Sequence, residues 1–177
     1  MNIFYLDHDP VIAAQMSCDK HVVKMILESA QMLSTSHRVL DGDEYANEVG
    51  LYKLAHKNHP STIWVRSSNE HYAWLYKHMI ALNEEYKKRY NHTKNHLTID
   101  KLGDILKHPP KNAKYNKIAT EPKPAMPDHC KIPGDAVESY RKYYCIEKQR
   151  FATWKSPAVV PQWYIEGVKY YQNTAEI

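Results

Sequence analysis

The clearest hydrophobic pattern in this 177-residue chain covers residues 17–33. Apolar residues recur there at intervals of three and four positions, which predicts one long helix with a buried face. They are Val22, Ile26, Ala30 and Leu33, with Val23 and Leu27 beside them. Ser17 or Asp19 is placed to cap the first free backbone N–H groups. We expect this helix to end near residues 36–38.

Similar patterns predict helices on either side of this segment. Asp9-Pro10 indicates a helix start, because proline at the first helical position loses no hydrogen bond. Asp43 is expected to cap a helix, and Ser67-Ser68-Asn69 predicts a kink or a new cap within a second long helical block. The predicted segments are residues 11–16, 44–55, 61–91 and 98–107.

The last third of the chain begins with a segment in which proline excludes continuous helix. Six prolines interrupt residues 108–134. Helix is expected to resume after Asp135, and Pro161 starts a closing aromatic segment that reaches Tyr171. There is no alternating β pattern, internal repeat or sign of a second domain. The pattern therefore predicts an all-α fold, with residues 1–177 forming a single compact helical domain that contains a long irregular proline-rich loop.

Composition narrows the setting of this fold. Three scattered cysteines do not make a disulfide framework, which indicates a reducing compartment. No apolar run approaches the ~20 residues of a membrane span, and the N-terminus does not resemble a signal peptide. We therefore expect a cytoplasmic protein without membrane contact. The net charge of +4 permits a phosphate-bearing partner without requiring one.

Basic and aromatic residues alternate in the segment after Asp135. The cations are Arg141, Lys142, Lys148 and Arg150, and the rings are Tyr140, Tyr143 and Tyr144. Positive charge interleaved with stacking surface is typical of a face that grips a nucleic-acid strand. The same pattern also fits an amphipathic helix whose basic side is merely solvated. The residues alone leave both interpretations open.

His21 and Glu28 form the most suggestive pair of ionisable residues. They are seven residues apart, so on a helix they lie about 20° from the same azimuth and ~10 Å apart along the axis. An imidazole and a carboxylate on one face can serve acid–base chemistry. Equally, such a glutamate can be solvated and such a histidine packed or capped.

Several common chemistries lack their motifs. The chain has no glycine-rich phosphate loop, no G-x-S-x-G and no H-E-x-x-H. His56 with His59, and His92 with His96, are spaced like metal ligands but have no cysteine or acidic partner in a known pattern. We therefore expect no metal and no cofactor.

Three blocks together resemble the bacteriophage pyrimidine-dimer DNA glycosylase/apurinic-site lyase (endonuclease V-like) family. Asp19-Lys20-His21 followed by Glu28 looks like the family's helix with Asp-x-His and a catalytic glutamate. Asn58-His59-Pro60, ahead of an aromatic helix ending at residues 85–89, is similar to its middle block. Residues 131–136 and 148–155 resemble its C-terminal block. The order of the blocks agrees, and they cover about half of the chain.

The resemblance implies an N-terminal amine lying against the helix that bears Glu28. In that family the amine attacks C1′ of the sugar, displaces the base and leaves a Schiff base that undergoes β-elimination. Met1 would supply this amine, or Asn2 if Met1 is removed. Glu28 would stabilise the cationic sugar and relay protons, and His21 would orient the substrate or Glu28.

The resemblance also implies residues that bind the nucleic acid or nucleotide. Four cations would hold phosphates, Trp154 would pack against sugar or base, and the middle block and the basic aromatic face would complete the surface. These residues are Lys24, Arg141, Lys148, Lys155, Trp154, Asn58, His59 and Tyr144. Where the family has arginines beside its glutamate, this chain has Leu27 and Gln31. It is also longer, through residues 41–56 and the proline-rich loop, and these additions can reshape the expected cleft.

Two functions of different class follow from these features. One is a DNA glycosylase/lyase acting on a damaged or modified base. The other is a non-catalytic protein on the same scaffold that sequesters a nucleotide or nucleotide signal, as in phage counter-defence. The partner is accordingly DNA or a nucleotide. If the gene is carried by a phage, the site of action is the cytoplasm of the infected host cell.

Overall fold

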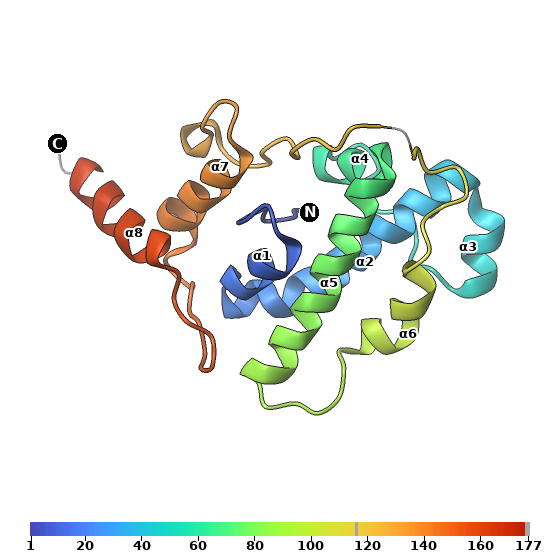
Figure 1. Cartoon of the computed structure of the whole chain (residues 1–177), viewed down its shortest axis with the longest axis horizontal. Coiled ribbons are helices and arrows are strands. Elements are labelled where there is room, and N and C mark those ends of the chain that lie inside the picture. Colours follow the sequence, from blue (N-terminus) through green and yellow to red (C-terminus); the bar gives the residue numbers. More distant parts are fainter. Residues whose placement is uncertain (116, 176–177) are drawn as a thin grey trace.

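A computed structural model describes residues 1–115 and 117–175. The described residues form eight α-helices and no strand, which confirms the predicted all-α class (Figure 1). A short 3₁₀ helix, η1, and a π-helical turn, η2, lie in the last third. The elements are α1 (Pro10–Met16), α2 (Asp19–Asp41), α3 (Asp43–Val49), α4 (Pro60–Ser67), α5 (Asn69–Arg89), α6 (Leu97–Leu106), η1 (Asp128–Cys130), α7 (Ala136–Tyr143), η2 (Tyr144–Lys148) and α8 (Gln162–Ala175).

Two long helices, α2 and α5, organise the molecule. They cross near the middle of Figure 1 and pack against each other, while α1 packs on α5, and α4 and α6 pack on α2. The predicted apolar face of α2 is buried, with Val22, Ile26 and Leu33 fully inaccessible. Burial of such side chains contributes on the order of 1.5–3 kcal/mol each. The long central helix predicted from the sequence is therefore the centre of the core.

The N-terminal segment crosses this core and does not trail away from it (Figure 1). Its residues Ile3 to Leu6 are all buried. The Asn2 side-chain oxygen accepts hydrogen bonds from the backbone N–H of Ile3 at 2.7 Å and of Phe4 at 3.2 Å, and its amide donates to the Ala125 carbonyl at 2.9 Å. These contacts fix the position of the first residue.

The predicted starts of helices were more accurate than the predicted ends, although Asp43 was wrongly predicted as a cap: Gly42 takes the N-cap position and Asp43 is the first residue of α3. Asp9 caps α1, Ser68 caps α5 at the predicted break, and Asp135 caps α7. The long helix α2, however, continues beyond residues 36–38 to Asp41 and ends at Gly42, whose φ is +86°; Ser36 and His37 lie within it and are buried. α3 ends at Val49 instead of residue 55, because Gly50 takes a left-handed conformation with φ of +79°.

The cap predicted for α2 was wrong, and the structure gives the reason. Cys18 occupies the N-cap position without a side-chain hydrogen bond. Asp19 instead accepts from the backbone N–H of Lys155 at 2.9 Å and from the Thr153 hydroxyl at 2.9 Å. The Arg89 guanidinium donates to the same carboxylate at 3.2 Å. Asp19 therefore joins the C-terminal segment to α2 and α5.

The proline-rich segment is irregular apart from η1, as predicted. It runs from α6 along the top of Figure 1, past α4, to α7. The Trp64 indole N–H donates to the Thr120 carbonyl at 2.9 Å, which anchors the segment on α4. Among the described helices, none combines the length and the apolar character needed to cross a membrane.

Candidate active site

The α-amine of Met1 lies beside the carboxylate of Glu28. The Met1 nitrogen is 3.4 Å from Glu28 Oε1, and both side chains are largely buried. Glu28 Oε2 is also buried and has no hydrogen-bond partner among the described residues; the Lys24 ammonium is 3.8 Å from it. The juxtaposition of amine and carboxylate expected from the sequence is therefore present.

A pocket of about 420 Å³ opens at this pair. Its volume falls within the usual range of small-ligand sites. Leu27 and Gln31, where the resemblance expects arginines, both line it, so this part of the wall is uncharged. The lining residues are Met1, Val23, Lys24, Leu27, Glu28, Gln31, His56 and His96.

His56 and His96 belong to this pocket although the sequence suggested them only as metal-ligand pairs. His56 lines it from the turn before α4 and holds a left-handed backbone with φ of +46°, a strained conformation for a non-glycine residue. His96 lines it from the N-cap of α6, where its Nδ1 accepts from the Thr98 N–H at 3.1 Å. Helix α6 reaches α2 only through tertiary packing, so spacing in the sequence could not predict this meeting.

His59 lies close to the amine without lining the pocket. Its Nδ1 accepts from the Ser61 N–H at 3.1 Å, which caps α4 and, in the neutral ring, leaves the proton on Nε2. Burial lowers the pKa of His59, and the Met1 amine and His56 lower it further, whereas Glu28 acts in the opposite direction. Asn58, in the same turn, is exposed.

His21 packs against the N-terminal segment. Its ring stacks on Phe4 with centroids 3.9 Å apart, and its Nδ1 accepts from the Tyr144 hydroxyl at 2.6 Å. Burial, followed by the charges of Lys148, Lys24 and Lys20, lowers its pKa to about 3. With 3% of its surface exposed, His21 does not reach a substrate. Its position suits it to hold the first residues in place.

The family model described as pyrimidine dimer DNA glycosylase matches residues 1–98, which is more than half of the chain. The chain belongs to this family. No curated protein and no solved structure matches it. The amine, Glu28 and the whole lining of the pocket fall within the matched residues, and the C-terminal basic block lies outside them.

In this glycosylase-family protein, much of the C-terminal basic aromatic block packs inward. Tyr144 is completely buried, and Trp154 donates its indole N–H to the Met16 carbonyl at 2.9 Å. Arg141 donates to the Leu6 carbonyl at 2.9 Å and pairs with Asp7 at 3.3 Å. Burial assigns Tyr144 to the core and not to a nucleic-acid surface, and Arg141 is occupied in fixing the N-terminal segment.

Other cations of the chain lie over aromatic rings. The Lys148 ammonium is 4.6 Å from the centre of the Tyr143 ring and 5.8 Å from that of Phe4. The Lys20 ammonium lies 4.5 Å over Phe151, and Arg150 also approaches that ring. Lys155 lies over Tyr90 at 5.3 Å. Arg141 is already bonded to Leu6 and Asp7, so Lys148, which lies over Phe4 and Tyr143 and forms no ion pair with another described residue, is the sequence-predicted cation left for a phosphate beside the N-terminal segment.

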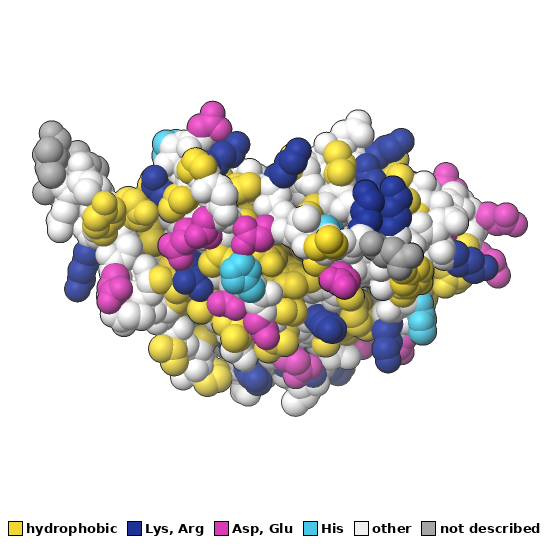
Figure 2. All heavy atoms as spheres, turned by 45° about the horizontal axis from the view of Figure 1, so that its top comes forward, with side chains coloured by type: hydrophobic (Ala, Val, Ile, Leu, Met, Phe, Trp, Pro, Cys, Tyr) yellow, Lys and Arg dark blue, Asp and Glu magenta, His cyan; other side chains and the backbone are white. Residues whose placement is uncertain are grey.

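The overall charge does not by itself mark a binding surface. The face drawn in Figure 2 carries basic and acidic side chains intermingled. The candidate phosphate contacts are therefore local groups such as Lys20, Lys24 and Lys148, whose charges all act on His21.

One further cluster has metal-ligand chemistry. His129, Cys130 and Glu147 bring potential ligand atoms within 4.8 Å of one another, and His129 Nε2 is 2.7 Å from Glu147 Oε1. The three side chains lie on η1 and η2 and are not among the residues that line the pocket at Met1. They are therefore not candidates for chemistry at the amine.

Proposed function

We propose that this protein is a DNA glycosylase/apurinic-site lyase that uses the α-amine of Met1 as nucleophile and Glu28 as its proton acceptor. The observation that carries the proposal is the 3.4 Å contact between these two groups at the edge of a ligand-sized pocket. A buried carboxylate next to an amine can take the proton that the amine must lose before it attacks.

The chemistry follows from this pair in balanced steps. The neutral amine attacks C1′ of the target nucleotide, the C1′–base bond breaks, and the base leaves with the electron pair and gains a proton. The attacking nitrogen loses a proton, the C1′–O4′ bond then breaks with protonation of O4′, and a Schiff base between the Met1 nitrogen and C1′ of the opened sugar results. Removal of a C2′ proton then breaks the C3′–O bond and releases the 3′ phosphate. Glu28 is the nearest carboxylate to the amine for these proton transfers.

Other side chains would position the substrate. Lys24 lies 3.8 Å from Glu28 on the preceding turn of α2 and would hold a phosphate, as would Lys20 and Lys148, whose ammonium groups both lie over the Phe151 ring. His21 would act indirectly, by fixing Phe4 and hence the N-terminal segment. Asn2 would supply the amine only if Met1 were removed. Its side chain is held in place because it accepts hydrogen bonds from the next two backbone N–H groups.

Borohydride trapping on abasic-site DNA tests the proposal. The imine should be reduced to a stable protein–DNA adduct, and peptide mapping should place the adduct on residue 1, whose presence intact mass confirms. The alternative nucleophile is the Lys24 side-chain amine, so Lys24→Gln is the matched control; because Lys24 would also hold a phosphate, the variant is assayed at saturating protein concentration, where it should still trap. A two-residue extension before Met1 should abolish trapping. No adduct with the wild-type protein, or an adduct lost in Lys24→Gln, would contradict the proposal.

One observation favours the second candidate function, sequestration of a nucleotide. Leu27 and Gln31 make part of the pocket uncharged, and loss of cations weakens the non-specific grip on duplex DNA. A sequestering protein should bind a free nucleotide tightly in calorimetry and give no trapped adduct. A glycosylase/lyase should show the reverse.

A further inference from the structure

A second pocket continues the first one along α2. It has a volume of about 480 Å³ and shares Gln31 with the pocket at Met1. Its other lining residues come from the irregular segment after α3 and from α6: Leu51, Tyr52, Lys53, Leu54, Ala55 and Lys101. The segment over residues 41–56, which lengthens this chain beyond the family pattern, thus supplies most of its wall.

The wall of this second pocket is held in place although it has no regular structure. The Tyr52 carbonyl accepts from the Arg38 guanidinium at 2.8 Å, and its N–H donates to the Ser34 hydroxyl at 3.3 Å. Ala55 donates its N–H to the Thr35 hydroxyl at 3.1 Å. The Tyr52 hydroxyl is 2.9 Å from that of Thr98 on α6. A loop tied to two helices in this way presents a preorganised surface.

The charges of the second pocket suit an anion next to a flat group. Lys53 and Lys101 line it, no carboxylate does, and neither lysine forms an ion pair with another described residue. The Lys101 ammonium lies 5.2 Å from the centre of the Tyr52 ring. Two free cations beside a half-buried ring and the exposed Leu54 match a phosphate with its attached sugar or base.

The amine lies between this pocket and the other surface cations. Lys20, Lys24, Glu28 and Gln31 follow one another at intervals of four, four and three residues, so they share one face of α2. Eleven residues of helix span about 16 Å. That distance corresponds to roughly five nucleotides of one strand in duplex DNA, at about 3.4 Å each. Lys148 joins Lys20 at one end of this path, and the second pocket lies at the other end.

We propose that the second pocket, lined by Tyr52, Lys53 and Lys101, holds the phosphodiester and sugar of a nucleotide flanking the attacked one. The occupant lies on the side of the target nucleotide away from Lys20 and Lys148. The DNA strand then follows α2, with the attacked sugar at Met1. This inference rests on the proposed function, because it requires that DNA reach the amine.

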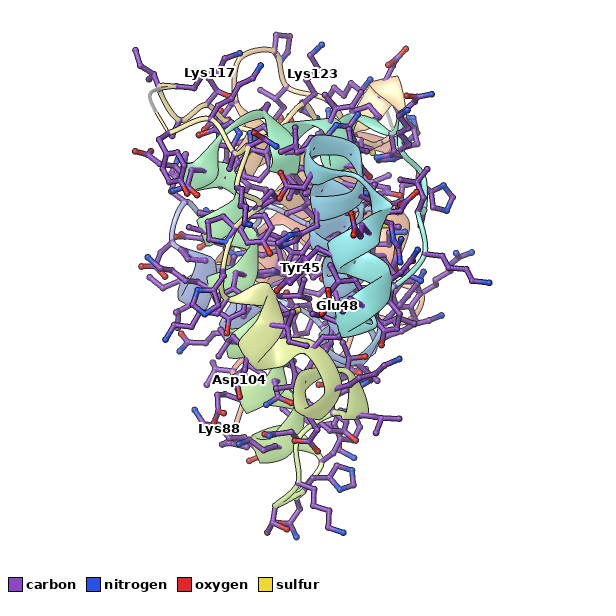
Figure 3. The ribbon with its side chains drawn as sticks, turned by 90° about the vertical axis from the view of Figure 1, so that its right-hand side faces the viewer. Tyr45, Glu48, Lys88, Asp104, Lys117 and Lys123 are labelled. Atoms are coloured by element: carbon purple, nitrogen blue, oxygen red, sulfur yellow. The ribbon has the colours of Figure 1, made fainter. Side chains whose placement is uncertain are left out.

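Charge reversal tests the flanking site. Lys53→Glu and Lys101→Glu should each weaken binding to abasic-site duplex by about tenfold at ~0.1 M salt and flatten the salt dependence of log K by about one or two units. Lys123→Glu is the matched control and should change affinity less than twofold. In Figure 3, Lys123 lies on the long loop, far from Asp104 on α6, the helix that carries Lys101. All three lysines are exposed, so folding should be unaffected, which circular dichroism checks.

Truncated substrates separate the outcomes. Removing the nucleotides on one side of the abasic site should abolish the difference between Lys53→Glu and wild type, and removing those on the other side should preserve it. An equal defect on both truncated duplexes, or variants that behave like Lys123→Glu, would overturn the flanking site while wild-type trapping still supports the proposed function. Failure of the wild type to trap would overturn the proposed function itself. Tight binding of a free nucleotide abolished by Lys53→Glu would assign the pocket to a nucleotide ligand instead.

Discussion

The sequence predicts roles in DNA chemistry for two regions of this molecule, the surroundings of Met1 and Glu28 and the C-terminal basic aromatic block. The structure shows that their predicted residues differ in arrangement. Around Met1 and Glu28, the predicted groups converge on a pocket. In the C-terminal block, Tyr144 and Arg141 face inward and hold the fold together, and Lys148 remains beside the surface rings. The comparison shows that the position of a single reactive residue can be predicted from a sequence pattern. An alternation of charged and aromatic residues, in contrast, does not predict which side of the helix the fold buries.

The largest effect is expected from Glu28→Gln. Removal of the proton acceptor next to the amine should lower strand cleavage on abasic-site DNA by about 10²–10⁴-fold, the usual range for a general base. Binding should stay within about twofold, because the amide keeps the shape of the side chain. Single-turnover cleavage and fluorescence anisotropy measure the two effects. Glu44→Gln, at an exposed position on α3, is the control. Equal cleavage by Glu28→Gln and Glu44→Gln would show that Glu28 is not the proton acceptor, and the region around Met1 would then have no more predicted chemistry than the C-terminal block.

The next effect concerns the contacts that join the two regions. Arg89 is buried and donates to the Ser17 carbonyl at 2.6 Å, to Asp19 at 3.2 Å and to Glu85 at 3.0 Å. Arg89→Met should leave two buried carboxylates without their cation and lower the free energy of unfolding by about 3–5 kcal/mol. Urea denaturation measures this. Arg150→Met, at an exposed position, should cost less than about 0.5 kcal/mol. Similar losses in both variants would show that the Asp19 junction is not structural.

The local parts of this architecture were predictable, and the junctions were not. Asp9, Ser68 and Asp135 act as the predicted caps, because a cap depends on its own next few residues; Asp43 is the exception, since Gly42 takes the N-cap position of α3. Asp19 does not act as a cap, because its carboxylate is held by Thr153 and Lys155, which are more than 130 residues away in the sequence. Long-range packing also explains why the pocket was only partly predicted. The spacing of His21 and Glu28 is local, but His56 and His96 reach the pocket through the packing of separate elements.

A smaller effect is expected from the pH dependence of stability. The unfolded chain protonates His21 near its ordinary pKa of 6.5, whereas burial lowers the pKa of the folded residue to about 3. The unfolded state therefore binds more protons between these values, and the free energy of unfolding falls as the pH falls. His21 alone should account for a loss of about 2 kcal/mol between pH 7.5 and pH 5.

Comparison with His21→Gln isolates this contribution. Glutamine can still accept from the Tyr144 hydroxyl but does not titrate, so the stability gap between the two proteins should narrow by about 2 kcal/mol over that range. His78, whose burial lowers its pKa to about 4, destabilises both proteins equally in acid and cancels. A gap that is constant with pH would show that His21 is not held neutral beneath Phe4.

The smallest effects compare Lys148 with Tyr144, two residues of one predicted surface. Lys148→Gln should lower affinity for abasic-site duplex by a few-fold and reduce the salt slope by about one, because one phosphate contact is lost. Tyr144→Phe should leave affinity and salt slope unchanged but lower the free energy of unfolding by about 1–2 kcal/mol, since its hydroxyl bonds the Cys18 N–H and the His21 ring. Titrations at several salt concentrations and urea denaturation of both variants measure the two quantities. A changed salt slope in Tyr144→Phe but not in Lys148→Gln would contradict this assignment of the two residues. A side chain without solvent contact alters phosphate binding only when the helix that carries it moves, so the phosphate contacts would then depend on the position of that helix and not on Lys148.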